Sequence, residues 1–222
     1  MDQVGSILER PKLYYNIDGV GELRGGFMML GYGLLLWLQV HSPSDAIWHK
    51  MYAFAIYMAV MFSIIHYGTM TIKNHITYPR TGFVEYRKRH TVWPRIVAMF
   101  AAPLALGGVL FARRHHWDIT ASVPLFGLLL AASYAYGFAR TVRWKWFVVW
   151  AMMLGSFAIA FLPASWFDAL AGDSWVTHPV RTKLVGALLL SLMLYGTMLL
   201  ISGGISLWLY LRHTQAPAQE GQ

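Results

Sequence analysis

The sequence predicts an all-α membrane protein, built as a bundle of six transmembrane helices. Hydrophobic residues make up 57% of its 222 residues and charged residues only 13%, against about 25% charged residues in soluble domains. Several apolar runs of about 17 or more residues carry no charge, which is the pattern of membrane-spanning helices. Lys and Arg gather in the connections between these runs. Together these observations predict a multi-pass membrane protein.

Three regions follow from the hydrophobic pattern. Residues 1–24 form an amphipathic N-terminal segment, residues 25–211 form the six-helix domain, and residues 212–222 form a polar tail that we expect to be disordered. The expected spans are about Gly25–Val40, Met51–Ile72, Ile96–Ala112, Ile119–Ala139, Trp146–Leu162 and Leu184–Leu211. The first span is short unless its helix begins earlier, within Asp18–Arg24. The last span, at about 42 Å, has to tilt, bend or protrude.

The distribution of basic residues predicts the orientation. With six spans, both termini lie on one side of the membrane. Thirteen of the 18 Lys and Arg residues then fall on the side of the termini and five on the other side. Because positively charged loops stay in the cytoplasm, both termini are predicted to be cytoplasmic. The net charge of +8 is therefore explained by loops that face anionic lipid, and we expect no nucleic-acid partner.

The densest basic cluster lies in the cytoplasmic loop 73–95, after the second span. Pro79-Arg80-Thr81-Gly82 has turn composition, and β-prone residues flank it at 76–78 and 83–86, so a short β-hairpin-like loop is expected. The candidate residues for binding a ligand or partner are Arg80, Thr81, Gly82, Arg87, Lys88 and Arg89.

Three roles for this loop stay open. It could lie on anionic headgroups as a positively charged surface. Arg80 could instead form a structural lock with Asp18 or Glu22, which precede the first span on the same side of the membrane. The third role is recognition of a phosphate-bearing ligand through the Arg80 guanidinium and the turn amides.

His66, in the second span, is the one ionisable residue that the pattern places clearly inside the hydrocarbon. We expect a neutral imidazole that is hydrogen-bonded to a neighbouring helix. A bis-histidine haem would need a second histidine at similar depth, and the other histidines map to the loops and the tail. Cysteine is absent, and the loop histidines lack metal-ligand spacing. No cofactor, metal site or catalytic residue is predicted.

Two motifs carry a resemblance. The segments Asp18-Gly-Val-Gly-Glu-Leu-Arg-Gly-Gly-Phe27 and Thr77-Tyr-Pro-Arg-Thr-Gly-Phe-Val-Glu-Tyr-Arg87 resemble a group of uncharacterised small bacterial integral membrane proteins. That group is marked by DG..EL..G before the first span and TYPRTGYV.YR after the second, and Phe83 stands here at the tyrosine position. The resemblance covers about thirty residues. It implies a bacterial inner-membrane location and supplies no activity.

The sequence therefore favours a non-enzymatic accessory or scaffold subunit that meets anionic lipid, or a partner in a membrane-protein complex, through its basic loop. A small transporter or channel component is the alternative, and a membrane-embedded enzyme or metal-binding protein comes third. No nucleophile–base pair or carboxylate pair can be assembled from the sequence. A transporter would need a polar path through the bundle, whereas a scaffold would bury close-packed helices.

Overall fold

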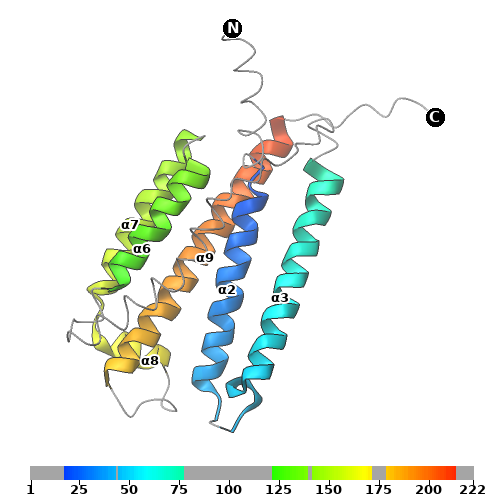
Figure 1. The fold of residues 1–222 in the computed structure, drawn as a ribbon. Helices are drawn as coiled ribbons and strands as arrows, with labels where there is room; N and C mark the ends of the chain where they lie inside the picture. Colours follow the sequence, from blue (N-terminus) through cyan, green and yellow to red (C-terminus); the bar gives the residue numbers. More distant parts are fainter. Residues whose placement is uncertain (1–17, 44, 78–121, 140–141, 172–178, 214–222) are drawn as a thin grey trace.

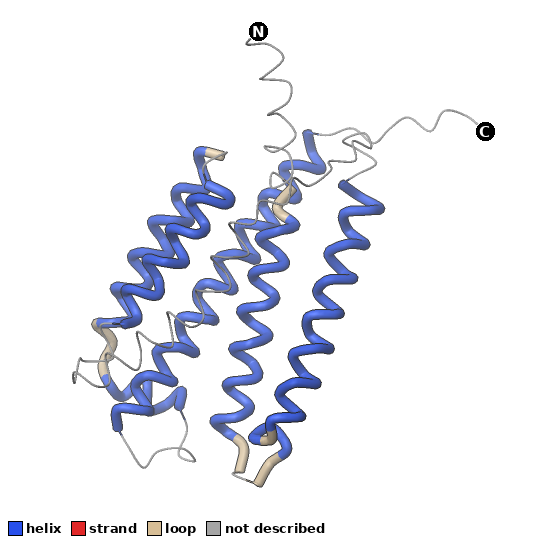
Figure 2. The backbone as a smooth tube through the Cα atoms, viewed as in Figure 1, coloured by secondary structure: helices blue, strands red, loops and turns tan. Residues whose placement is uncertain are grey.

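The computed structural model describes residues 18–43, 45–77, 122–139, 142–171 and 179–213. All regular structure in these ranges is helical, with no strand (Figure 2). The elements are α2 (Val20–His41), η1 (Ile47–His49), α3 (Met51–Ile72), η2 (Lys73–Thr77), α6 (Ser122–Tyr134), η4 (Ala135–Ala139), η5 (Arg143–Lys145), α7 (Trp146–Ala160), α8 (Ala164–Ala171) and α9 (Pro179–His213). The segments η1 and η5 are 3₁₀ turns, and η2 and η4 are π-helical.

Among the described residues, three helices are long and apolar enough to cross a membrane. They are Val20–His41, Met51–Thr77 and Val185–His213, with 22, 27 and 29 residues. The helices of the expected fourth and fifth spans are shorter, with 13 residues in α6 before its π-helical end and 15 residues in α7. The expected third span, Ile96–Ala112, lies outside the described residues, as do the N-terminal segment before Asp18 and the tail after His213.

Several boundaries differ from the expectation; α9, for example, begins at Pro179 rather than Leu184. The first helix begins at Val20 rather than Gly25, because Gly19 adopts a positive φ of 73° and so turns the chain into the helix there. Ile76 and Thr77, expected in one arm of the hairpin, belong instead to the π-helical end of the second span. The rest of the expected hairpin lies outside the described residues.

The long helix α9 runs through the middle of the bundle, with α2 on one side and the α6–α7 pair on the other (Figure 1). Helix α3 lies at the edge beyond α2, and α8 packs under the beginning of α9. A core cluster joins α6, η4, α7 and α9 through Tyr134, Met152 and Tyr195. A smaller one joins α7, α8 and α9 through Ile159, Phe167 and Ala187.

Glycines bring α2 and α9 into backbone contact. A Cβ added at Gly203 would lie 2.8 Å from the carbonyl oxygen of Gly19, and one added at Gly26 would lie 2.8 Å from that of Gly196. The paired positions show that the two helices run antiparallel. Close backbone approach of this kind is how small residues pack helices in membranes. One end of the bundle therefore holds the start of α2 and the end of α9, and this end is the place where charged side chains are buried.

Candidate functional site

The site begins at the first turn of α2, where the chain carries two carboxylates one turn apart. Asp18 Oδ1 accepts a hydrogen bond from the Val20 backbone N–H at 3.2 Å, and Glu22 follows within the helix. Both are buried, with 1% and 0% of their surface exposed. Negative charge at a helix N-terminus is favoured by the helix dipole. Full burial of two carboxylates also requires positive charge and hydrogen-bond donors around them.

Glu22 receives these partners from three other parts of the chain. Lys145 Nζ lies 2.9 Å from Glu22 Oε1, and the Tyr134 hydroxyl donates to the same oxygen at 2.7 Å. From α9, Ser202 Oγ donates to Oε1 at 3.3 Å and Ser206 Oγ donates to Oε2 at 3.1 Å. Tyr134 and Ser202 also contact each other, with their oxygens 2.7 Å apart. We call these five residues the Glu22 site.

Local structure explains how these groups converge. Ser202 and Ser206 are four residues apart on α9, so they share a face, and Gly203 between them lets α2 approach that face. Lys145 ends the η5 turn just before α7 and is 1% exposed. Its Nζ also lies 5.7 Å from the centre of the Phe138 ring. Glu22 therefore links α2 to α6, to the start of α7 and to α9 at a single point.

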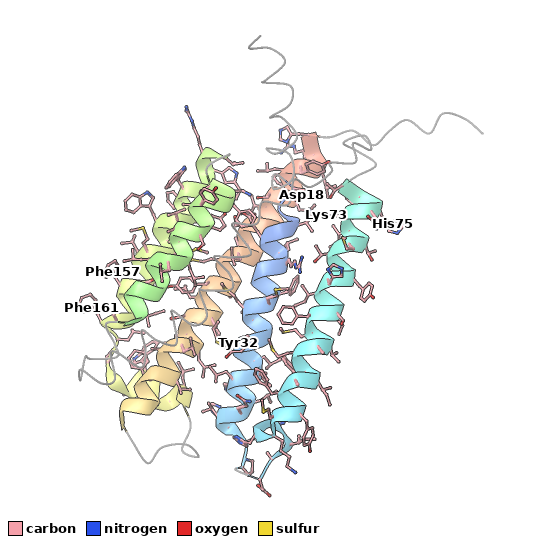
Figure 3. The ribbon with its side chains drawn as sticks, in the orientation of Figure 1. Asp18, Tyr32, Lys73, His75, Phe157 and Phe161 are labelled. Atoms are coloured by element: carbon pink, nitrogen blue, oxygen red, sulfur yellow. The ribbon has the colours of Figure 1, made fainter. Side chains whose placement is uncertain are left out.

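A second ion pair lies beside the Glu22 site and involves η2, the π-helical continuation of α3. Lys73 Nζ is 3.8 Å from Asp18 Oδ2, and both side chains are at most 7% exposed; Figure 3 shows the two residues together at the shared end of α2 and α3. Burial raises the pKa of Asp18, while the charge of Lys73 opposes that rise. One turn on from Lys73, the Thr77 carbonyl accepts a hydrogen bond from the Tyr210 hydroxyl of α9 at 3.1 Å.

Taken together, Asp18, Glu22, Lys73 and Lys145 form a charge-balanced cluster. Its two cations come from η2, directly after α3, and from η5, and its two anions lie just before α2 and in its first turn. Such a cluster favours one arrangement of the helices. Any helix arrangement that separates a buried charge from its partner is destabilised, because the charge is then left uncompensated. Within the described ranges, no group of three His, Cys, Asp or Glu residues is placed to hold a metal ion.

The structure brings together part of the predicted site. Asp18 and Glu22 are both buried at the start of α2, and the cations that pair with them in the described structure are Lys73 and Lys145. The loop candidates Arg80, Thr81, Gly82, Arg87, Lys88 and Arg89 lie outside the described residues, so their pairing and binding roles stay predictions.

His66 lies on the surface of α3 in the described part of the chain. Its side chain is exposed on the surface of α3, where its ring meets that of the adjacent Tyr67 edge-on at 5.8 Å. The expected hydrogen bond from His66 to a neighbouring helix is therefore not formed within the described structure.

The sequence pattern alone does not single out four residues of the Glu22 site, namely Tyr134, Lys145, Ser202 and Ser206. It places Lys145 among the cations of a connection and the other three inside apolar spans. Two sequence features point to these residues. The run Ser202-Gly-Gly-Ile-Ser206 places two hydroxyl groups on one helix face beside glycines that allow another helix to approach closely. Lys145 stands between Trp144 and Trp146 in the sequence.

Comparison with known proteins adds no assignment: no family model, curated protein or solved structure matches the chain. The resemblance noted above thus stays an expectation that rests on the two motifs alone.

Proposed function

We propose that this protein is a non-enzymatic scaffold or accessory subunit of the bacterial inner membrane, with six spans and both termini in the cytoplasm. Its cytoplasmic end would contact anionic lipid or a partner protein, through the basic loop 73–95 and the cations around it. The observation that carries the proposal is the separation of charges at this end of the bundle. The buried charges form ion pairs with one another, while exposed cations of the described residues lie on the surface.

The exposed cations come from three separate elements that end at the same place. Arg24 lies in the first turns of α2, Arg143 lies in η5 and Arg212 lies in the last turn of α9, and all three side chains are exposed. Arg212 also stacks over the Trp208 ring at 5.4 Å, the type of amphipathic pair found at the headgroup level. Such a group of cations attracts phosphate headgroups, at about 1 kcal/mol for each residue near an anionic surface.

The course of the chain supports a crossing within residues 78–121. Helix α3 ends beside the start of α2, where Lys73 meets Asp18. Helix α6 ends near the same point, since Tyr134 reaches Glu22, so α6 begins at the opposite end (Figure 1). The chain between α3 and α6 has to connect the two ends of the bundle. The apolar run Ile96–Ala112 supplies a span for that connection.

The interior favours a scaffold over the alternative, a small transporter. Transport requires helices that change their contacts around a site. Here the helices nearest the buried carboxylate touch through their backbones, and both oxygens of Glu22 already receive donors. An arrangement of this kind fixes helix positions.

Lipid retention tests the proposal. The protein would be reconstituted in nanodiscs of phosphatidylcholine and phosphatidylglycerol, and the lipids that it keeps would be counted by native mass spectrometry. We expect the triple variant Arg24→Gln, Arg143→Gln, Arg212→Gln to lose retained phosphatidylglycerol. The control Lys50→Gln, at the opposite end, should keep it. Equal retention of both lipids by the unmodified protein would contradict the lipid-binding role, and co-purification in mild detergent then tests the partner role.

A further inference from the structure

Helix α3 is the least buried of the three long helices in the described structure. Ala53 is the only buried one of its 22 residues, whereas α2, which has the same number of residues, buries six. None of the residues 54–72 is buried, and a Cβ added at Gly68 would meet nothing within 4 Å. Burial resumes in η2, at Lys73 and Thr77. Apolar burial therefore contributes little to the position of the C-terminal end of α3.

The packing of α3 on α2 is found in the first half of the helix. The Tyr57 hydroxyl donates to the Gly31 carbonyl at 2.8 Å, and the Met61 side chain packs on the same glycine. Lys73 lies about 18 Å further along the helix axis. The end of α3 therefore needs contacts of its own.

Polar groups supply these contacts. Lys73 pairs with Asp18 at the start of α2, and the Thr77 carbonyl accepts a hydrogen bond from the Tyr210 hydroxyl of α9 at 3.1 Å. Figure 3 shows Asp18 and Lys73 together, with His75 on the outer side of η2. The two contacts are one turn apart and join η2 to both α2 and α9.

The two buried ion pairs at this end of the bundle differ in closeness. Lys145 Nζ lies 2.9 Å from Glu22 Oε1, and three hydroxyl groups also donate to that carboxylate. Lys73 Nζ lies 3.8 Å from Asp18 Oδ2, which is beyond hydrogen-bond distance. Burial raises the pKa of Asp18 even beside Lys73, because pairing offsets only part of the desolvation of the carboxylate. The ion pair that holds α3 is therefore the weaker of the two.

We propose that α3 is a movable helix, and that Lys73 and Thr77 form a latch that fastens its end to α2 and α9. The glycine contacts and the Glu22 site join α2, α6, α7 and α9 into the fixed part of the bundle. Polar latch contacts can be exchanged for water or headgroups at modest net cost, whereas the fixed part would lose its core. Lys73 is also the first residue of the basic loop 73–95, so release of the latch moves the start of that loop.

This inference goes beyond the proposed function and can fail independently of it. Lipid retention that depends on the exposed arginines would keep the lipid-binding role even if α3 proved fixed. A movable α3 in a protein that retains both lipids equally would do the reverse.

Distances between spin labels provide the test, because the chain has no cysteine of its own. One pair of introduced cysteines, at His75 of η2 and Tyr136 of η4, spans the bundle at the latch end. A second pair, at Met51 and Phe161, spans the opposite end. All four side chains are exposed. The distance distributions would be measured by double electron–electron resonance in nanodiscs.

Two variants remove the ion pair from either side. Lys73→Met keeps a long side chain without the charge, and Asp18→Asn keeps an oxygen that accepts the Val20 N–H. We expect both variants to shift the distances between positions 75 and 136 to longer values with a broader distribution. The distances between positions 51 and 161 should stay unchanged.

Two further variants complete the design. Tyr210→Phe removes the hydrogen bond to the Thr77 carbonyl, so it should increase the shift that Lys73→Met produces. The matched control is Lys50→Met, at the lysine that precedes the other end of α3. It should leave the distances between positions 75 and 136 as they are in the unmodified protein.

Two results would overturn the proposal. Unchanged distances between positions 75 and 136 in both ion-pair variants would show that other contacts hold the end of α3. Equal broadening of both label pairs would show that the Asp18–Lys73 pair supports the whole bundle and not one movable helix.

Discussion

Glu22, in the first turn of α2, lies 2.9 Å from Lys145, the last residue before α7, and at most 1% of either side chain is exposed. Two helices far apart in the sequence are thereby held together at one end of the bundle. Three hydroxyl groups donate to the carboxylate, so each of its two oxygens accepts at least one hydrogen bond. This arrangement makes specific predictions about which substitutions are costly.

Removal of the Tyr134 hydroxyl should destabilise the protein. Tyr134→Phe keeps the ring in its core cluster but removes a 2.7 Å hydrogen bond to the Glu22 carboxylate. A hydrogen bond to a charged group contributes about 1.5–3 kcal/mol. We expect a lower apparent melting temperature by tryptophan fluorescence in detergent. Tyr136→Phe, at an exposed position two residues away, is the matched control and should melt as the unmodified protein does.

Adjacent glycines of α9 should respond differently to alanine. At Gly203 the added methyl group would lie 2.8 Å from backbone atoms of Gly19 and Leu23, whereas at Gly204 it would meet nothing within 4 Å. Forcing extra volume into a packed contact typically costs about 1–3 kcal/mol. Gly203→Ala should therefore lower the melting temperature, and Gly204→Ala should leave it equal or higher, since alanine favours the helix. Equal behaviour of the two variants would refute the backbone contact.

The proposed topology predicts opposite labelling of two introduced cysteines. Position 88 belongs to the basic loop, and Asp45 is an exposed residue between α2 and α3. With both termini in the cytoplasm, an impermeant maleimide added to intact cells should modify a cysteine at Asp45 and not one at Lys88. Modification of position 88 from outside would reverse the orientation.

The expected absence of haem can be tested through His66. We predict no Soret absorption from the purified protein, because a bis-histidine site would need a second histidine at the same depth. A stoichiometric Soret band that disappears in His66→Ala would contradict this and would favour an electron-transfer role.

The sequence was most informative where charge and hydrophobicity change abruptly. Lys50 and Lys73 flank a run without Lys, Arg, Asp or Glu, and the predicted span Met51–Ile72 coincides with α3. It was least informative about pairing between distant residues. Charge counting assigns Lys145 to a side of the membrane but cannot show that its side chain turns inward to Glu22. Likewise, Tyr134, Ser202 and Ser206 fit apolar helices by their position, and only the three-dimensional packing reveals that their hydroxyls meet.

The central claim is that the Glu22–Lys145 pair fixes the arrangement of the bundle. A double-mutant cycle tests it, with Glu22→Gln, Lys145→Met and the double variant compared by thermal unfolding in nanodiscs. Each single change leaves an uncompensated buried group, a loss of about 3–5 kcal/mol. The double variant should lose clearly less than the sum of the two. Purely additive losses, or single variants as stable as the unmodified protein, would contradict the account.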